Sequence, residues 1–329
     1  MAQPVTVYRW DDPGAPQLTN RKPSEIINVL KKCLVEGYGT KTPLGWTLEF
    51  EDAPNFKAAF RNSTAAGGSG GYVQCKSSNG TDNSNIAVSM TPAKSMTDID
   101  TLVQRGFIKP FSLTSGWVCW VLIGTGTGFY LISGLATSLI SQWATNLEFT
   151  AFVGDIDSLI PADPARFVVA SAITQSGDLS NTSYASWNVA WNPGNTGVST
   201  EVMRCYDADN ANSYRSYTIQ FPYHAQLSSV RPAATDLTLK RDIYHRAMIV
   251  LSGVSFGTSN TLDRLGKWIF QSDVSPYLRG FLPGYLVEFA PRYTSENWPV
   301  IENIDGRQHW LLRQGGNSIA GHWINMEQW

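Results

Sequence analysis

Residues 277–289 constrain the fold most, because glycine and proline interrupt an apolar run that no regular helix would tolerate. Gly280 and Gly284 permit backbone angles closed to other residues, and Pro283 fixes its own φ angle and lacks an N–H donor. The segment is therefore expected to bend twice while packing five apolar side chains: Leu278, Phe281, Leu282, Tyr285 and Leu286. It holds no candidate nucleophile or base, so we predict an architectural role for it.

The length of the chain bounds its organisation. Its 329 residues exceed the ~150 of a typical domain, which predicts one large unit or two closely associated ones. We expect an N-terminal arm over residues 1–22, followed by a helix and a β-rich region over residues 23–173. A second β-rich region over residues 174–329, with an aromatic and polar excursion, is expected to pack with the preceding region as one unit.

Charged residues make up only 16% of the chain, against roughly 25% in ordinary soluble proteins. There are 12 tryptophans, 13 tyrosines and 14 phenylalanines, and interface cores are rich in aromatic side chains and poor in Lys and Glu. An aromatic β core and a surface buried against partners explain this composition equally well. The interface hypothesis singles out residues of the arm and of the polar excursion: Val5, Tyr8, Trp10, Tyr184, Trp187 and Trp191.

Several classes of partner and ligand are not expected. The formal net charge is −2 and no run of Lys or Arg suits a phosphate backbone, which argues against nucleic acid. No stretch reaches the ~20 uncharged apolar residues of a membrane helix, and the start lacks the apolar region of a signal peptide, so neither membrane insertion nor secretion is expected. The cysteines are far apart and without zinc-like spacing, which predicts reduced and mostly buried thiols: Cys33, Cys75, Cys119 and Cys205.

One substantial helix is predicted over residues 24–36. Ser24 can cap it, Pro23 is expected to precede the cap, and Gly37 supplies the stop. Apolar residues recur at helical spacing and are expected to face the core: Ile26, Ile27, Val29, Leu30, Cys33 and Leu34.

The rest of the chain is typical of strands and turns. Residues 117–123 and 129–132 predict a hairpin around the glycine-rich turn at 124–128, and residues 309–313 and 321–325 predict a last hairpin. Other strands are expected at 5–10, 46–50, 55–61, 72–75, 86–91, 149–153, 167–173, 242–253, 266–270 and 286–290. The fold class is therefore mainly β, a sandwich or distorted barrel with one substantial N-terminal helix.

Two aspartate pairs are the first candidates for chemistry. Asp155 with Asp157, and Asp98 with Asp100, stand two residues apart and would project from one face of an extended strand. Such pairs can cleave a glycosidic bond or bind a metal, but aspartates at strand ends and turns more often cap the backbone. We expect the capping role for both pairs.

The histidines and the glycine-rich loop offer little more. Four histidines have no mutual spacing that fixes a metal or a triad: His224, His245, His309 and His322. His309 and His322 are candidates to face one another across the last hairpin as a weak two-ligand site. Residues 65–71 lack the Gly-Lys-Ser/Thr ending of a phosphate loop and are expected to be flexible. We therefore predict no catalytic residue, no cofactor and no metal site, and the chain is not expected to be an enzyme.

Four segments carry motifs that together cover both ends and parts of the middle of the chain. They are residues 23–39, which end in Gly-Tyr-Gly, the Ala-Ala-Phe-Arg-Asn run at 58–62, residues 96–101, and the Arg-Gly-x-Leu-Pro-Gly pattern at 279–284. In these segments the chain resembles a family of virion structural proteins of tailed bacteriophages. Many members of that family carry an additional β-rich insertion after the Gly-x-Gly, which this chain lacks.

The resemblance implies a structural component of the virion, assembled in the host cytoplasm, and in the first place a tail, baseplate or tail-tip protein. Its partners would be other virion proteins and further copies of itself in a symmetric ring or trimer. Two alternatives stay open: a head-decoration or neck protein, and a host-surface adsorption module that binds or hydrolyses glycans.

Overall fold

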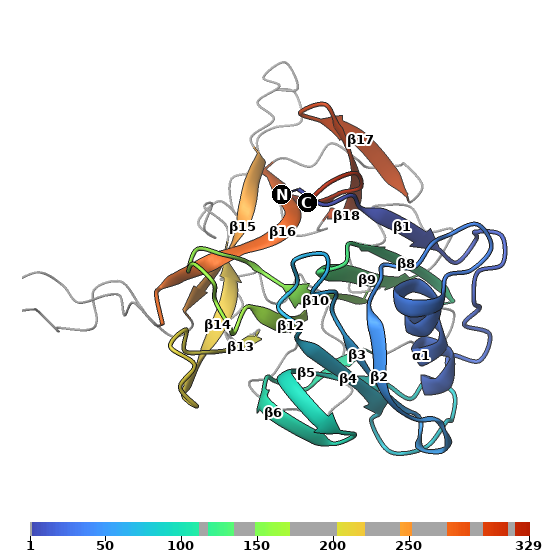
Figure 1. Ribbon diagram of the computed structural model, residues 1–329. Coiled ribbons are helices and arrows are strands. Elements are labelled where there is room, and N and C mark those ends of the chain that lie inside the picture. The colour runs from blue at the N-terminus through green and yellow to red at the C-terminus, as the bar shows by residue number, and fades with distance from the viewer. Residues whose placement is uncertain are drawn as a thin grey trace, which may run out of the picture.

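The computed structural model describes residues 2–111, 118–134, 149–171, 203–220, 244–251, 275–289, 299–314 and 320–329. The prediction of a mainly β fold is confirmed, since these residues form three antiparallel sheets and one helical segment of 14 residues near the N-terminus (Figure 1). None of the helical residues within these ranges forms a span long and apolar enough to cross a membrane.

Two of the sheets are built from the first half of the chain. The five-stranded sheet has the order β1 (Thr6–Arg9), β8 (Cys119–Gly124), β9 (Gly128–Gly134), β10 (Phe149–Asp155) and β12 (Phe167–Ser171). The six-stranded sheet has the order β2 (Thr47–Asp52), β3 (Lys57–Arg61), β4 (Tyr72–Ser77), β5 (Val88–Asp98) and β6 (Thr101–Arg105), with β7 (Lys109–Phe111) also paired to β5.

The third sheet has eight strands and comes mostly from the second half of the chain. Its order is β13 (Met203–Tyr206), β14 (Tyr214–Gln220), β15 (Tyr244–Leu251), β16 (Leu278–Phe289), β19 (Ala320–Asn325), β18 (Arg307–Gln314) and β17 (Val300–Ile304). The short β11 (Asp157–Ser158) pairs with β16 and so links this sheet to the end of β10.

The five-stranded sheet is the middle layer and is buried on both faces. In β8, Val121 and Ile123 pack with the eight-stranded sheet, whereas Trp120 and Leu122 pack with the helix and the six-stranded sheet. Because side chains alternate along a strand, two buried faces produce the unbroken apolar runs of β8 and β9 rather than a polar alternation. The core shared with the eight-stranded sheet joins residues from both sides of the expected boundary at residue 173.

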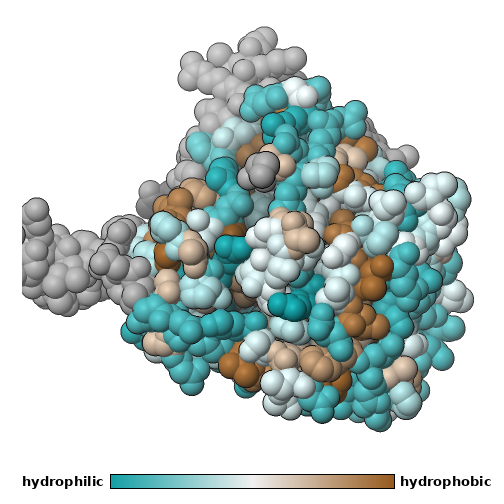
Figure 2. All heavy atoms as spheres, in the orientation of Figure 1, coloured by the Kyte–Doolittle hydropathy of each residue, from teal (hydrophilic) through white to brown (hydrophobic). Residues whose placement is uncertain are grey.

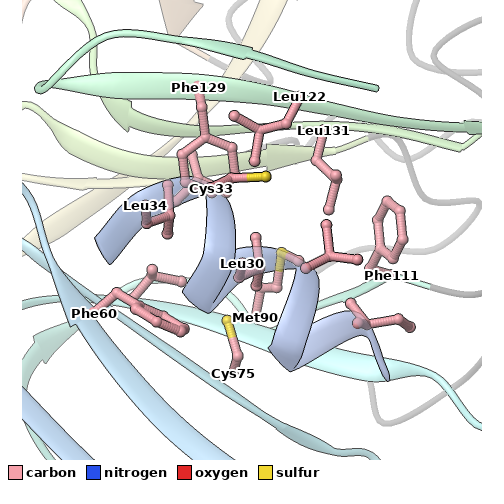
Figure 3. Close-up of a cluster of buried hydrophobic side chains, with 14 of the residues drawn as sticks. Leu30, Cys33, Leu34, Phe60, Cys75, Met90, Phe111, Leu122, Phe129 and Leu131 are labelled. Atoms are coloured by element: carbon pink, nitrogen blue, oxygen red, sulfur yellow. The ribbon is translucent and has the colours of Figure 1, made fainter. Parts of the chain in front are cut away.

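The helix fills the space between the middle sheet and the six-stranded sheet (Figure 3). Helix α1 covers Pro23–Lys31, continues as a π-helical turn over Lys32–Glu36, and ends at Gly37, whose φ of 79° favours glycine. The expected burial of its apolar stripe is confirmed, with exposures of 0–6% for Ile26, Ile27, Val29, Leu30, Cys33 and Leu34.

The helix cap differs from the prediction. Lys22 is the N-cap residue and Pro23 is the first helical residue, where a missing N–H costs nothing. The Glu25 carboxylate accepts hydrogen bonds from the backbone N–H groups of Lys22 at 3.2 Å and Asn20 at 3.0 Å. Ser24 instead donates its hydroxyl to Asp82 at 2.7 Å, which ties the helix start to the loop before β5.

Residues 1–22 are not a free arm. Strand β1 pairs with β8 along its whole length, and Tyr8 is fully buried. The backbone N–H of Val5 donates to the Glu327 carbonyl at 2.9 Å. The segment expected as an N-terminal arm is therefore part of the fold, because β1 extends the middle sheet and covers its core.

Strand β16 departs twice from a regular ladder at the positions that the sequence singled out. Against β15 its register shifts once across residues 282–285, which include Pro283 and Gly284, and again at Arg279, next to Gly280. Of the five apolar side chains expected to pack, Leu282 and Tyr285 are buried and the other three are half-buried.

Most of the other expected elements are present. Strands β8 and β9 form the predicted hairpin, β18 and β19 form the last one, and all four cysteines are buried and outside any disulfide. Strand β3 starts only at Lys57, because a 3-10 turn over Ala53–Asn55 precedes it. The expected strand at 266–270 lies outside the described residues.

Asp100 carries a network on the six-stranded sheet that should show in the pH dependence of stability. Partial burial acts to raise the pKa of Asp100, but hydrogen bonds from Lys57, Lys76 and Gln74 outweigh it and hold that pKa well below its usual range. A lowered folded-state pKa stabilises the fold above the unfolded pKa of about 4, and this contribution is lost as the pH falls through the folded value.

We expect Asp100→Asn to lower the free energy of unfolding at neutral pH by at most about 1 kcal/mol, because the side chain is 41% exposed. Asparagine tolerates the left-handed φ of 66° at this position, so the substitution isolates the charge. The difference from wild type should vanish in strongly acidic buffer in chemical denaturation, and Asp98→Asn serves as the control. A difference that persists there would contradict the electrostatic origin.

Candidate functional site

A polar cleft of about 360 Å³ lies where elements of all three sheets meet. We use "polar cleft" for the space lined by the β8–β9 turn, the segment from Asp155 to Arg166, the glycine-rich loop, β16 and both ends of the described chain. Its lining residues are Gln3, Gly67, Thr125, Thr127, Asp155, Ile156, Asp157, Ser158, Ile160, Pro161, Ala162, Arg166, Pro283 and Trp329. The aspartate pair of Gly-Asp-Ile-Asp is thus brought to one site.

Asp155 is a heavily hydrogen-bonded residue of the polar cleft. It ends β10 and is 7% exposed. Its carboxylate accepts hydrogen bonds from the backbone N–H of Ser69 at 2.7 Å, from the Ser69 hydroxyl at 2.5 Å and from Arg166 Nε at 3.1 Å. These donors occupy both carboxylate oxygens, so Asp155 acts first as an anchor for the loop that carries Ser69.

The glycine-rich loop at 65–71 is held in place rather than free. Arg166 donates to the Gly67 carbonyl at 2.9 Å, and Gln3 donates its side-chain amide to the Ala66 carbonyl at 2.5 Å. The backbone N–H of Ser63 donates to the Gly126 carbonyl at 2.8 Å, which joins the loop base to the β8–β9 turn. Partners far along the chain thus bind the backbone of this loop, which argues against the expected flexibility.

Asp157 is the more accessible carboxylate of the pair. It lies in β11 opposite Phe281, its side chain is 51% exposed, and it forms an ion pair with the guanidinium of Arg246. Partial desolvation by the surrounding protein raises the pKa of Asp157, while the Arg246 guanidinium acts to lower that pKa. Both carboxylates of the polar cleft thus have an arginine partner.

A buried ion pair supports the polar cleft from behind. Arg279 donates to both carboxylate oxygens of Asp163 at 2.8 and 2.7 Å and to the Tyr206 carbonyl at 3.1 Å, and neither charged side chain is exposed. On the same strand, the Pro283 carbonyl accepts the hydroxyl of Tyr130 at 2.8 Å. The sequence did not reveal this pair. Its only signal was a charge inside an apolar run, which must be compensated if it is buried.

The other candidates lie away from the polar cleft. Asp98 accepts a hydrogen bond from the backbone N–H of Ile99 at 2.7 Å in the β5–β6 turn, consistent with capping. His309 stands opposite Asn325 in the last hairpin, whereas His322 stands opposite Arg313, so the two histidines do not face one another. His224 lies outside the described residues. In the part of the chain that the structure describes, no three His, Cys, Asp or Glu side chains are grouped to hold a metal ion.

The residues expected at an interface have different environments. Tyr8 belongs to the core and donates its hydroxyl to the Thr42 carbonyl at 2.5 Å, so its side chain cannot contribute to an interface. Val5 and Trp10 are half-buried and pack against the core. Tyr184, Trp187 and Trp191 lie outside the described residues.

Exposed apolar side chains are dispersed over the described surface. Five large ones are more than a third exposed and belong to different parts of the chain: Val103, Val118, Leu159, Tyr214 and Ile301. On the face drawn in Figure 2, hydrophobic residues form several separate patches among hydrophilic ones. The expected self-association therefore stays a prediction.

The arrangement in the polar cleft is suited to binding. Two carboxylates, the Arg166 guanidinium and several hydroxyls line this small space and provide both acceptors and donors, and Arg246 pairs with Asp157 from outside the lining. Acid–base catalysis by the aspartates would require them to leave partners that they already have.

In comparisons with known proteins, no protein-family model matches this chain and no curated protein matches it.

Proposed function

We propose that the chain is a structural component of a tailed-phage virion, most directly a tail, baseplate or tail-tip protein that acts through subunit contacts. The proposal rests on the resemblance of its sequence motifs to virion structural proteins, and on the use that the fold makes of those motifs. In each described case, the motif residues hold strands and turns together.

The Arg-Gly-x-Leu-Pro-Gly pattern at 279–284 is the observation that carries the proposal. Arg279 of this pattern forms the buried ion pair with Asp163. A Cβ atom on Gly280 would lie 2.3 Å from the Asp157 carbonyl oxygen. Gly284 has a φ of 61°, and a Cβ atom there would lie 2.2 Å from the indole of Trp329. The pattern is thus required for close packing of β16 against β11 and the C-terminal residues, which is an architectural use.

Two other motifs serve in the same way. The hydroxyl of Tyr38, within Gly-Tyr-Gly, donates to Asp12 at 2.9 Å and ties the end of the helix to the turn after β1. In the segment at 96–101, Asp100 binds the two lysines of β3 and β4. In each of these contacts the polar group is engaged by a partner within the fold, which favours an assembly role over a catalytic one.

The proposal predicts that the chain is present in mature particles of the phage that encodes it. Quantitative mass spectrometry of gradient-purified particles should find the chain in a fixed ratio to the major tail protein. Antibody labelling in the electron microscope should mark the tail or its end. Labelling of the head or neck would favour the head-decoration alternative, and absence from purified particles despite expression in infected cells would overturn the proposal.

A further inference from the structure

We infer that the polar cleft is a binding site for one or two units of a neutral saccharide. This inference goes beyond the proposed virion role and does not depend on it. It rests on the balance of charge in the polar cleft, on its mixture of donors and acceptors, and on an indole in its wall.

The charges of the polar cleft cancel in pairs. Arg166 lies 3.1 Å from Asp155, and Arg246 is paired with Asp157. A phosphate or a carboxylate ligand would meet two aspartates, and a cationic ligand would compete with two arginines already in place. Because complementary charge decides which ligands a polar site admits, paired charges favour a ligand without net charge.

The polar groups suit a ligand rich in hydroxyls. A sugar hydroxyl both donates and accepts a hydrogen bond, so it needs acceptors and donors side by side. The half-exposed Asp157 carboxylate provides acceptors and the Arg166 guanidinium provides donors. Thr127 adds a hydroxyl that can donate or accept, whereas the Ser158 hydroxyl in the lining already donates to Asp163. An apolar ligand would displace water from these groups without offering them hydrogen bonds, at a cost in affinity.

One wall of the polar cleft is apolar and fixed in position. Trp329 donates its indole N–H to the Asn325 carbonyl at 2.9 Å and stands edge-on to Tyr130 at a centroid distance of 5.3 Å. Pro283 and Ile160 also line the polar cleft. An amphipathic ring beside polar groups is the combination that accepts the C–H face of a sugar while its hydroxyls reach the opposite wall.

The size agrees with a small unit. A volume of about 360 Å³ is at the lower end of the roughly 300–1,000 Å³ of ligand sites. The polar cleft therefore fits one or two sugar units, as a free saccharide or as the end of a longer chain.

Saturation-transfer difference NMR on the full chain tests the inference with named probes. The neutral probes are glucose, galactose, N-acetylglucosamine and maltose, and the charged probes are glucuronic acid and glucosamine, each at about 10 mM, which detects a Kd near 1 mM. We expect at least one neutral probe to bind and the charged probes to bind more weakly.

Matched variants locate the binding. Ile160→Trp adds bulk to the lining and should abolish the signal, whereas Leu159→Trp changes an exposed neighbour that does not line the polar cleft and should preserve it. Asp157→Asn keeps the shape but removes the charged acceptor and should weaken binding at least tenfold, with Asp98→Asn as the control. Circular dichroism checks that each variant is folded.

Three results would overturn the inference. One is the absence of a signal from every neutral probe, and another is equal or stronger binding of the charged probes. The third is binding that survives both Ile160→Trp and Asp157→Asn, since it would place the saccharide elsewhere on the chain.

Discussion

Replacing Asp163 with alanine should lower the free energy of unfolding by about 3–5 kcal/mol. This is the largest effect that we expect from removing a single polar side chain. The reason is that Arg279 would remain fully buried without the two hydrogen bonds that now compensate its charge. Guanidinium denaturation followed by circular dichroism measures the loss. A change below about 1 kcal/mol would show that water or another group replaces the carboxylate.

Two further variants separate the cause. The double variant Asp163→Leu/Arg279→Met removes both charges and should recover a large part of the lost stability, because apolar replacements of a buried pair are often tolerated. Recovery should be incomplete, since Asp163 also accepts the Ser158 hydroxyl at 2.7 Å. Asp11→Ala is the surface control. It breaks the exposed ion pair with Arg9 and should cost less than about 1 kcal/mol.

Leu30→Asp should destabilise the fold by about 4 kcal/mol or more, enough to prevent accumulation of folded protein. Leu30 has no exposed surface and lies between the middle sheet and the six-stranded sheet, so a carboxylate there would be buried without a partner (Figure 3). The yield of soluble protein and its thermal unfolding measure the effect.

The matched control introduces the same residue on the opposite side of the helix. Asn28 is exposed, so Asn28→Asp should change stability by less than about 0.5 kcal/mol. If Leu30→Asp yields some folded protein, lowering the pH to about 5 should recover part of its stability, because burial raises the pKa of the new carboxyl and protonation removes its charge. Equal stability of the two variants would contradict the position of the helix.

Local patterns in the sequence were sufficient for most individual elements. The helical spacing of Ile26, Val29, Leu30 and Cys33 identified the buried face, and the apolar runs around residues 124–128 identified the β8–β9 hairpin. Both signals depend on residues that are close in sequence, and periodicity reports them directly.

Long-range pairing could not be obtained in this way. Arg279 and Asp163 are 116 residues apart, and β1 finds its partner more than 110 residues along the chain. The aspartates of the polar cleft were noticed, but their arginine partners and the contact with Ser69 come from other elements. Register also separates the two histidines, since His309 stands opposite Asn325 and His322 opposite Arg313 in the last hairpin.

A cryo-EM reconstruction of the intact particle tests the proposed virion role most directly. The account predicts density at the tail, baseplate or tail tip into which the three-sheet fold fits in several copies related by symmetry. The same map would show whether Val5, Trp10 and the residues around Tyr184, Trp187 and Trp191 meet a neighbouring subunit. A complete map of the particle in which no density fits this fold would contradict the account.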